Sequence, residues 1–121
     1  MKMYRATGGF KKDTKNIGTY YTSSIEEAKF YGENIKTADI DTTNFMIVSE
    51  NELNLYIANW LNSLNNDERN FEESTKRYIY NQQDEILAAD DAKKHGYDGI
   101  ILKNITGESG CVCDYVIIFW L

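Results

Sequence analysis

Residues 96–121, GYDGIILKNITGESGCVCDYVIIFWL, decide the fold of this chain. Two short apolar runs rich in β-branched residues predict two neighbouring strands of one sheet. The runs are separated by turn-forming residues: Asn104, Gly107, Ser109 and Gly110. Because the run at 116–121 is continuously apolar, we expect a strand that is buried on both faces, in the middle of the core. Asp114 stands where that strand begins, and it is the main candidate for a functional residue.

Length and composition limit the class of protein. With 121 residues and 42% hydrophobic content, we expect a single globular domain over residues 1–121. The net charge of −6 argues against direct binding of nucleic acid, which would require a basic patch. An acidic surface could instead meet a basic protein partner, or it could only keep the chain soluble.

Targeting and metal signals are weak. The sequence has no apolar stretch near the length of a membrane span and no signal peptide, so we expect a cytoplasmic monomer. Cys111 and Cys113 are badly spaced for bridging each other, which favours free thiols. The sole histidine, His95, is interpreted as a helix-end residue, and no metal site is expected.

The remaining elements follow from periodicity and capping signals. Ser23 and Glu26 form a predicted capping box for a short helix whose inner face would be Ile25, Ala28 and Tyr31 and which ends at Gly32. Ser49 and Glu52 predict a second box, before the most regular apolar stripe of the chain. We expect strands at 3–7, 19–22, 35–41 and 45–48, helices at 53–64, 71–80 and 82–95, and a turn at 65–70. Strands and helices are segregated along the chain, so the predicted class is α+β.

Four segments together resemble the ADP-ribosyltransferase-like domains. They are YRAT at 4–7, GTYYTSSIEEAKFYG at 18–32, GYDGII at 96–101 and DYVIIF at 114–119. The nearest resemblance is to the small domain found in phage polyvalent proteins and toxins. It implies a split pair of small β-sheets around an NAD cleft, with flanking helices on the outside and the helical middle of this chain as an insert.

The resemblance also implies roles for individual residues. Asp114 and Arg5 would be catalytic, with Asp114 in the place of the family's carboxylate and Arg5 also contacting NAD. The NAD-binding set would be Tyr4, Arg5, Thr7, Tyr21, Thr22, Ser23 and Tyr31. These types suit the chemistry: a carboxylate stabilises an oxocarbenium-like ribose, an Arg grips a pyrophosphate, and an aromatic ring packs on nicotinamide. The chain departs from the family in having Asp114 where Glu is usual, and Glu108 is a candidate second carboxylate.

Two functions therefore stay open. The first is an NAD-dependent mono-ADP-ribosyltransferase that modifies a protein target, for example a nucleic-acid-binding defence protein, as a phage-encoded inhibitor such as an anti-CRISPR protein. The second is a catalytically degenerate relative that inhibits a basic partner by binding alone. Asp114 separates them, because only the first needs its negative charge.

Overall fold

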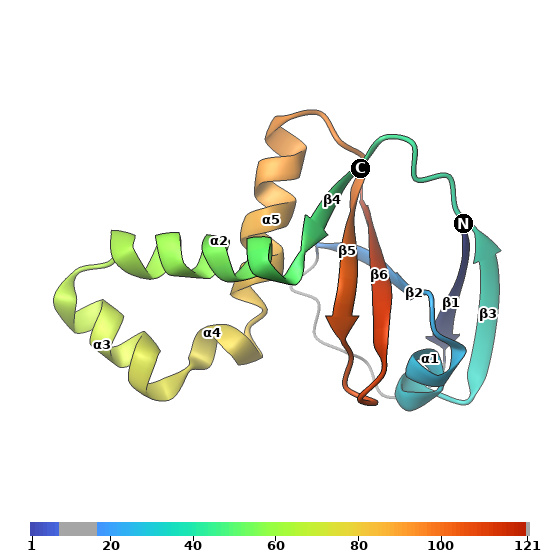
Figure 1. Ribbon diagram of the computed structural model, residues 1–121, viewed down its shortest axis with the longest axis horizontal. Helices are drawn as coiled ribbons and strands as arrows, with labels where there is room; N and C mark the ends of the chain where they lie inside the picture. The colour runs from blue at the N-terminus through green and yellow to red at the C-terminus, as the bar shows by residue number, and fades with distance from the viewer. Residues whose placement is uncertain (8–16, 121) are drawn as a thin grey trace.

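The C-terminal strands lie inside a six-stranded sheet, as their apolar pattern predicts (Figure 1). The computed structural model describes residues 1–7 and 17–120. The strands are β1 (Lys2–Thr7), β2 (Gly18–Thr22), β3 (Asn34–Asp39), β4 (Phe45–Ser49), β5 (Gly99–Thr106) and β6 (Val112–Phe119). The helices are α1 (Ile25–Tyr31), α2 (Glu50–Ser63), α3 (Asn66–Thr75), α4 (Arg77–Tyr80) and α5 (Gln83–Lys94). This order confirms the α+β class.

The sheet has the order β3-β1-β2-β6-β5-β4, so sequence neighbours are not always spatial neighbours. All adjacent strands are antiparallel except β4 and β5, which are parallel and are connected through the helices α2 to α5. Strand β6 lies between β2 and β5, and it is buried on both faces as predicted. Ile117 belongs to the apolar cluster on one face, and Val116 belongs to the cluster on the other.

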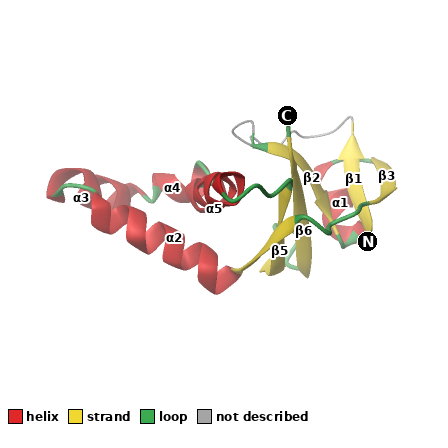
Figure 2. Ribbon diagram, turned by 90° about the horizontal axis from the view of Figure 1, so that it is seen from above, coloured by secondary structure: helices red, strands yellow, loops and turns green. Residues whose placement is uncertain are grey.

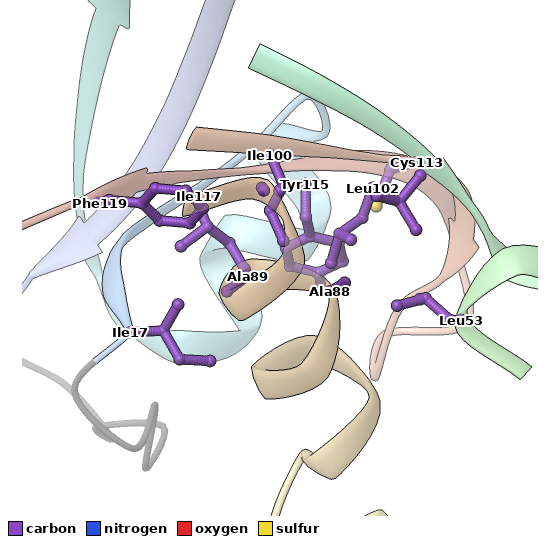
Figure 3. Packing of buried hydrophobic residues seen from close by; sticks show 12 residues of the cluster. Ile17, Leu53, Ala88, Ala89, Ile100, Leu102, Cys113, Tyr115, Ile117 and Phe119 are labelled. Atoms are coloured by element: carbon purple, nitrogen blue, oxygen red, sulfur yellow. The ribbon is translucent and has the colours of Figure 1, made fainter. Parts of the chain in front are cut away.

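The larger cluster lies between the sheet and α2 and α5 (Figures 2 and 3). Its helix side is contributed chiefly by Leu53 of α2 and by three small residues of α5, Ala88, Ala89 and Ala92. Small side chains let a helix approach the sheet closely, so Leu102 and Ile117 become almost completely inaccessible to solvent. The predicted apolar stripe of α2 faces inward: Leu53 and Leu61 are buried, and its other members, Tyr56, Ile57, Trp60 and Leu64, are half-buried. Leu55, which lies outside the stripe, is 61% exposed.

The second cluster contains no helical residue. Met3, Ile40, Ile101 and Val116 form it, and Met3 and Val116 have no exposed surface. Four partly buried side chains pack against this cluster: Tyr21, Ala38, Phe45 and Ile118. Figure 1 shows β2 crossing between the β4–β5–β6 part and the β1–β3 part.

The two parts of the sheet are joined by a narrow link. Between β1 and β2 the only registered pair is Tyr4 with Thr22, whereas β1 and β3 pair along the whole of both strands. The strands thus form one sheet that is nearly divided between β1 and β2.

The structure corrects the predicted capping of α1. Ser24, one residue after the predicted cap, is the N-cap, and its side chain accepts a hydrogen bond from the Glu27 amide at 3.2 Å. Ser23 is instead bonded to β6. Of the predicted inner face, Ala28 is buried and Tyr31 is half-buried, as expected, but Ile25 is 40% exposed and Glu27 is buried instead. The predicted end of the helix at Gly32 is confirmed.

The middle of the chain also differs from the prediction. Residues 65–70 are not a turn, because Asn65 caps α3 by accepting from the Glu68 amide at 2.8 Å. The helix predicted at 71–80 is broken at Lys76, whose φ of 50° is incompatible with a continuous helix. By contrast, the Ser49–Glu52 capping box and the end of α5 before Gly96, with φ of 80°, are confirmed. No helix in the described residues is long and apolar enough to cross a membrane.

Candidate functional site

The three strands that carry the predicted catalytic and NAD-binding motifs are consecutive in the sheet. β1 is followed by β2 and then by β6, although β6 begins 90 residues after β2 ends. Tyr4 pairs with Thr22, and Thr22 pairs with Tyr115, so these three residues form one row across the strands. The row fixes the register of the motifs relative to one another.

Alternation along the strands then assigns each predicted residue to a face. Tyr4 and Thr22 share the face of Tyr115, which is the face covered by α2 and α5. Arg5 and Asp114, one residue along from Tyr4 and Tyr115, are on the opposite face, together with Tyr21 of the second cluster. The predicted catalytic and NAD-binding residues are therefore divided between the two faces of the sheet. The structure brings Arg5, Tyr21 and Asp114 to one face, and it does not describe the side chain of Thr7.

Ser23 connects the second and last strands directly. Its backbone N–H donates to the Asp114 carbonyl oxygen at 2.9 Å, and its hydroxyl accepts from the Asp114 N–H at 2.8 Å. The Ser23 side chain therefore replaces a backbone acceptor at the point where β2 ends. These two bonds place the Ser-containing motif beside the predicted catalytic carboxylate.

The carboxylate of Asp114 lies at a β-bulge. Leu102 pairs with Tyr115 and Ile105 pairs with Cys113, so β5 advances three residues while β6 advances two. In the bulge, Asn104 has φ of 53°, and its N–H donates to Asp114 Oδ1 at 2.9 Å.

The other oxygen of the same carboxylate has a charged partner. Lys103 Nζ lies 3.1 Å from Asp114 Oδ2, and the two side chains are 41% and 16% exposed. Both oxygens of Asp114 are therefore engaged, which holds the side chain in one orientation. The same contacts give Asp114 a structural role, since its carboxylate accepts from the Asn104 N–H, which the bulge leaves without a backbone partner on β6.

Thr22 has a clear local role on the helix-covered face. It is 4% exposed, its hydroxyl donates to Cys113 Sγ at 3.4 Å, and it accepts from the Ser24 N–H at 3.3 Å. Burial raises the pKa of the Cys113 thiol. Both cysteines are free thiols, as predicted.

Tyr31 lies with a group that the sequence did not identify, a buried carboxylate on α1. Glu27 has no exposed surface, and four donors point at it. The N–H groups of Glu108 and Ser109 lie 3.0 and 2.9 Å from its oxygens, the Tyr31 hydroxyl lies at 3.5 Å, and the Tyr115 hydroxyl also donates to it. Glu27 therefore fastens α1 to β6 and to the turn between β5 and β6.

Electrostatics around Glu27 are dominated by these donors. Burial by itself would raise the pKa of Glu27, but the hydrogen bonds from Ser109, Tyr115 and Glu108 outweigh it, and the pKa lies below its ordinary value. Burial and the Glu27 contact raise the pKa of Tyr115. Nothing in the sequence distinguishes Glu27 from a solvated residue in a helical first turn, because three of its four donors come from residues more than 80 positions later. The side chain of Glu108 is exposed, and only its amide takes part.

Arg5 has a second cation beside it. β1 and β3 are paired in register, and Arg5 lies opposite Lys36. Both residues are exposed. Within residues 1–7 and 17–120, no ion pair or hydrogen bond joins either side chain to an acidic group. The face that carries Asp114 thus also carries two neighbouring positive charges.

An open hollow of about 430 Å³ lies at the other end of β6. Its lining residues are Lys93, Tyr97, Asp98, Ile118, Phe119 and Trp120. Trp120 is six residues from Asp114 along the strand direction, which is about 20 Å. The hollow is therefore separate from the site of Asp114 and Ser23.

The described part of the chain brings together no group of three or more His, Cys, Asp or Glu side chains suited to a metal ion. Comparison with family models, with curated proteins and with solved structures finds no match to this chain. The function is therefore argued from the site alone.

Proposed function

We propose that this chain is an NAD-dependent mono-ADP-ribosyltransferase with an ADP-ribosyltransferase-like fold, acting on a protein target. One observation carries the proposal: the strands with Arg5, Ser23 and Asp114 are adjacent, and Ser23 is hydrogen-bonded to Asp114 at 2.8 and 2.9 Å. These are the strands that the sequence resemblance makes the walls of an NAD cleft. The near division of the sheet between β1 and β2 is compatible with the split sheet of that fold.

The residues present suit a dinucleotide. Arg5 is exposed and can bind a pyrophosphate with its planar fork, and Asp114 can face the ribose beside it. When the bond from ribose C1′ to the nicotinamide nitrogen breaks, nicotinamide keeps the electron pair and positive charge develops on the ribose. The Asp114 carboxylate stabilises that charge. A nucleophilic atom of the target protein then forms the new bond to C1′ and loses its proton.

Fixation of Asp114 serves this chemistry. A carboxylate that turns freely must be ordered in the transition state, whereas one held by Asn104 and Lys103 is already oriented. The β-bulge positions the carboxylate of Asp114, whose side chain is one methylene shorter than the Glu that is usual in the family that the sequence resembles.

The direct test is Asp114→Asn in an assay with labelled NAD and a lysate containing target proteins. Asn keeps the acceptor for the Asn104 N–H, so the fold should persist, but it lacks the negative charge. We expect transfer to fall at least about a hundredfold with little change in NAD affinity. Arg5→Ala should weaken NAD binding by about 1.5–3 kcal/mol. Absence of NAD binding by the wild type at millimolar ligand would refute the proposal.

The second candidate, an inhibitor that binds a basic partner without chemistry, is favoured by one observation. Asp114 already has a structural function, since it completes the bulge with Asn104 and pairs with Lys103. The net charge of −6 suits a basic partner. This candidate predicts that Asp114→Asn inhibits as well as the wild type does and that neither protein transfers ADP-ribose. In either case the proposed setting is a phage-encoded inhibitor of a bacterial defence protein.

A further inference from the structure

We infer that Lys36 and Arg5 form a two-cation site for the pyrophosphate group of a dinucleotide, and this inference rests on the proposed function. Arg5 was the only cation among the residues expected to contact the nucleotide. The registered pair of β1 and β3 adds Lys36, a residue of the edge strand that no motif identified.

The pairing of β1 with β3 places the side chains of Arg5 and Lys36 next to each other. Residues directly opposite in an antiparallel pair have Cβ atoms about 5 Å apart, and their side chains are on the same face. Arg5 and Lys36 are such a pair, and both are exposed. Two cations at this spacing can contact the two phosphates of a pyrophosphate at once, with the Arg fork binding one and the ammonium group binding the other.

The positive charges of Arg5 and Lys36 repel each other in this pair. Like charges directly opposite in a sheet destabilise it, and a chain with 19 acidic residues could easily supply a neutralising partner. Among the residues that the structure describes, neither cation has one. Lys2, by comparison, lies opposite Asp39 on the same two strands. Within the described residues the two cations therefore repel each other without compensation, and a bound anion would relieve this repulsion.

The position of this pair relative to Asp114 also suits a dinucleotide. β1 and β6 are separated by β2, which puts them about 10 Å apart on a flat sheet. Arg5 and Asp114 are on opposite sides of the Tyr4–Thr22–Tyr115 row, which adds about 7 Å along the strands and gives about 12 Å overall. An Arg side chain spans several ångströms of this distance. The remaining separation suits the pyrophosphate and the nicotinamide ribose of one dinucleotide.

The test compares Lys36→Met with Lys94→Met. Both variants raise the net negative charge by one, and Lys94 is an exposed residue in the last turn of α5, away from β1 and β3. Calorimetry with inorganic pyrophosphate should show about tenfold or greater weakening for Lys36→Met and less than twofold for Lys94→Met. Lys36→Arg should keep most of the affinity for pyrophosphate. Adenosine monophosphate has one phosphate, so its affinity should differ less between Lys36→Met and Lys94→Met.

A measurement without ligand gives the site an independent check. In low salt, Lys36→Met should unfold at a higher urea concentration than the wild type, because the repulsion with Arg5 is removed, and added salt should reduce the difference. Lys94→Met should not be stabilised, since Lys94 interacts favourably with the helix C-terminus. The inference is overturned if the wild type does not bind millimolar pyrophosphate, or if Lys36→Met binds it as well as Lys94→Met does.

Failure of the inference and failure of the proposed function are distinguishable. If pyrophosphate binding depends on Lys36 but no ADP-ribose is transferred, the anion site stands and the transferase proposal fails. If transfer occurs and the KM for NAD is unchanged in Lys36→Met, the transferase proposal stands and the role of Lys36 is refuted.

Discussion

Replacement of Glu27 by Gln tests whether the buried carboxylate of α1 holds the site together. The two oxygens of Glu27 are unequal. Oε1 accepts from the Ser109 N–H at 2.9 Å, whereas Oε2 accepts from the Glu108 N–H at 3.0 Å and from the hydroxyls of Tyr115 and Tyr31. A Gln amide must put its NH₂ group at one of these positions.

The lower-energy orientation puts the NH₂ group at the Oε1 position. One hydrogen bond, that of Ser109, is then lost, and two N–H groups face each other. The remaining bonds persist but no longer involve a charge. A charge-assisted bond contributes about 1.5–3 kcal/mol, so we expect Glu27→Gln to lower the free energy of unfolding by about 2 kcal/mol at neutral pH. Glu27→Ala would leave several buried donors without acceptors and cost about 3–5 kcal/mol, a large part of the stability of a small domain.

The pH dependence of this loss has a definite sign. The folded pKa of Glu27 is lowered from its ordinary value of 4.5, so its contribution to stability is present above that value and is lost as pH falls through the folded pKa. The difference between wild type and Glu27→Gln should therefore be largest at neutral pH and should shrink as the solution is acidified below about pH 4.5.

Urea denaturation at several pH values measures both quantities. Glu26→Gln is the matched control, because Glu26 is next to Glu27 on the same helix, its side chain is 68% exposed and its ion pair with Lys29 is long, at 3.7 Å. It should change stability by less than about 0.5 kcal/mol. The reasoning is refuted if Glu27→Gln unfolds at the same urea concentration as Glu26→Gln at neutral pH.

Three further predictions follow from single contacts. Gly107→Ala should destabilise the protein by about 1–3 kcal/mol in urea denaturation, because a Cβ there would overlap the Glu27 carboxylate and force it to shift; a neutral result would contradict the packing. Asn104→Ala should lower the free energy of unfolding by about 1 kcal/mol, whereas Asn104→Gly should not, because the φ of 53° at this position is unfavourable for Ala and allowed for Gly. Equal stability of the two variants in urea denaturation would contradict the bulge geometry. Burial and the Asp91 contact raise the pKa of Tyr56 to about 12. Tyr20, Tyr31 and Tyr115 also have raised pKa values, so ultraviolet titration of Tyr56→Phe should lose one of several late-ionising tyrosines, the one that titrates near pH 12. The contribution of Tyr56 to stability is present below the ordinary value of 10.0 and is lost as pH rises through about 12.

Much of the fold could be predicted because its signals are local. Apolar runs gave β5 and β6, the capping box gave the start of α2, and Gly96 marked the end of α5. Errors occurred where two local signals compete. Ser23 and Ser24 are equally good caps by residue type, and the choice between them depends on β6, which offers its N–H to Ser23.

The candidate site could be predicted only in part, because its geometry depends on strand register. The strands of Arg5 and Asp114 both neighbour β2, but only the strand order shows this, and no local sequence pattern predicts that order. Tyr4 and Thr22 lie on the opposite face of the sheet from Arg5 and Asp114, and this could be known only from the pairing of Tyr4 with Thr22. Lys36 and Glu27 were missed for the same reason, since each is distinguished only by a partner distant in sequence or on another strand.

The position of Asp114 depends on three long-range attachments, and they act on different parts of the residue. Ser23 holds its backbone, Asn104 and Lys103 hold its carboxylate, and Glu27 holds the neighbouring Tyr115 from the opposite face. Apart from that of Tyr115, none of these side chains belongs to the apolar clusters. Loss of one attachment therefore displaces the carboxylate without emptying the core. Under the proposed transferase function, a displacement of about 1 Å already slows the chemistry, so changes at Ser23, Asn104 or Lys103 test catalysis at a smaller cost in stability than loss of the buried Glu27 carboxylate.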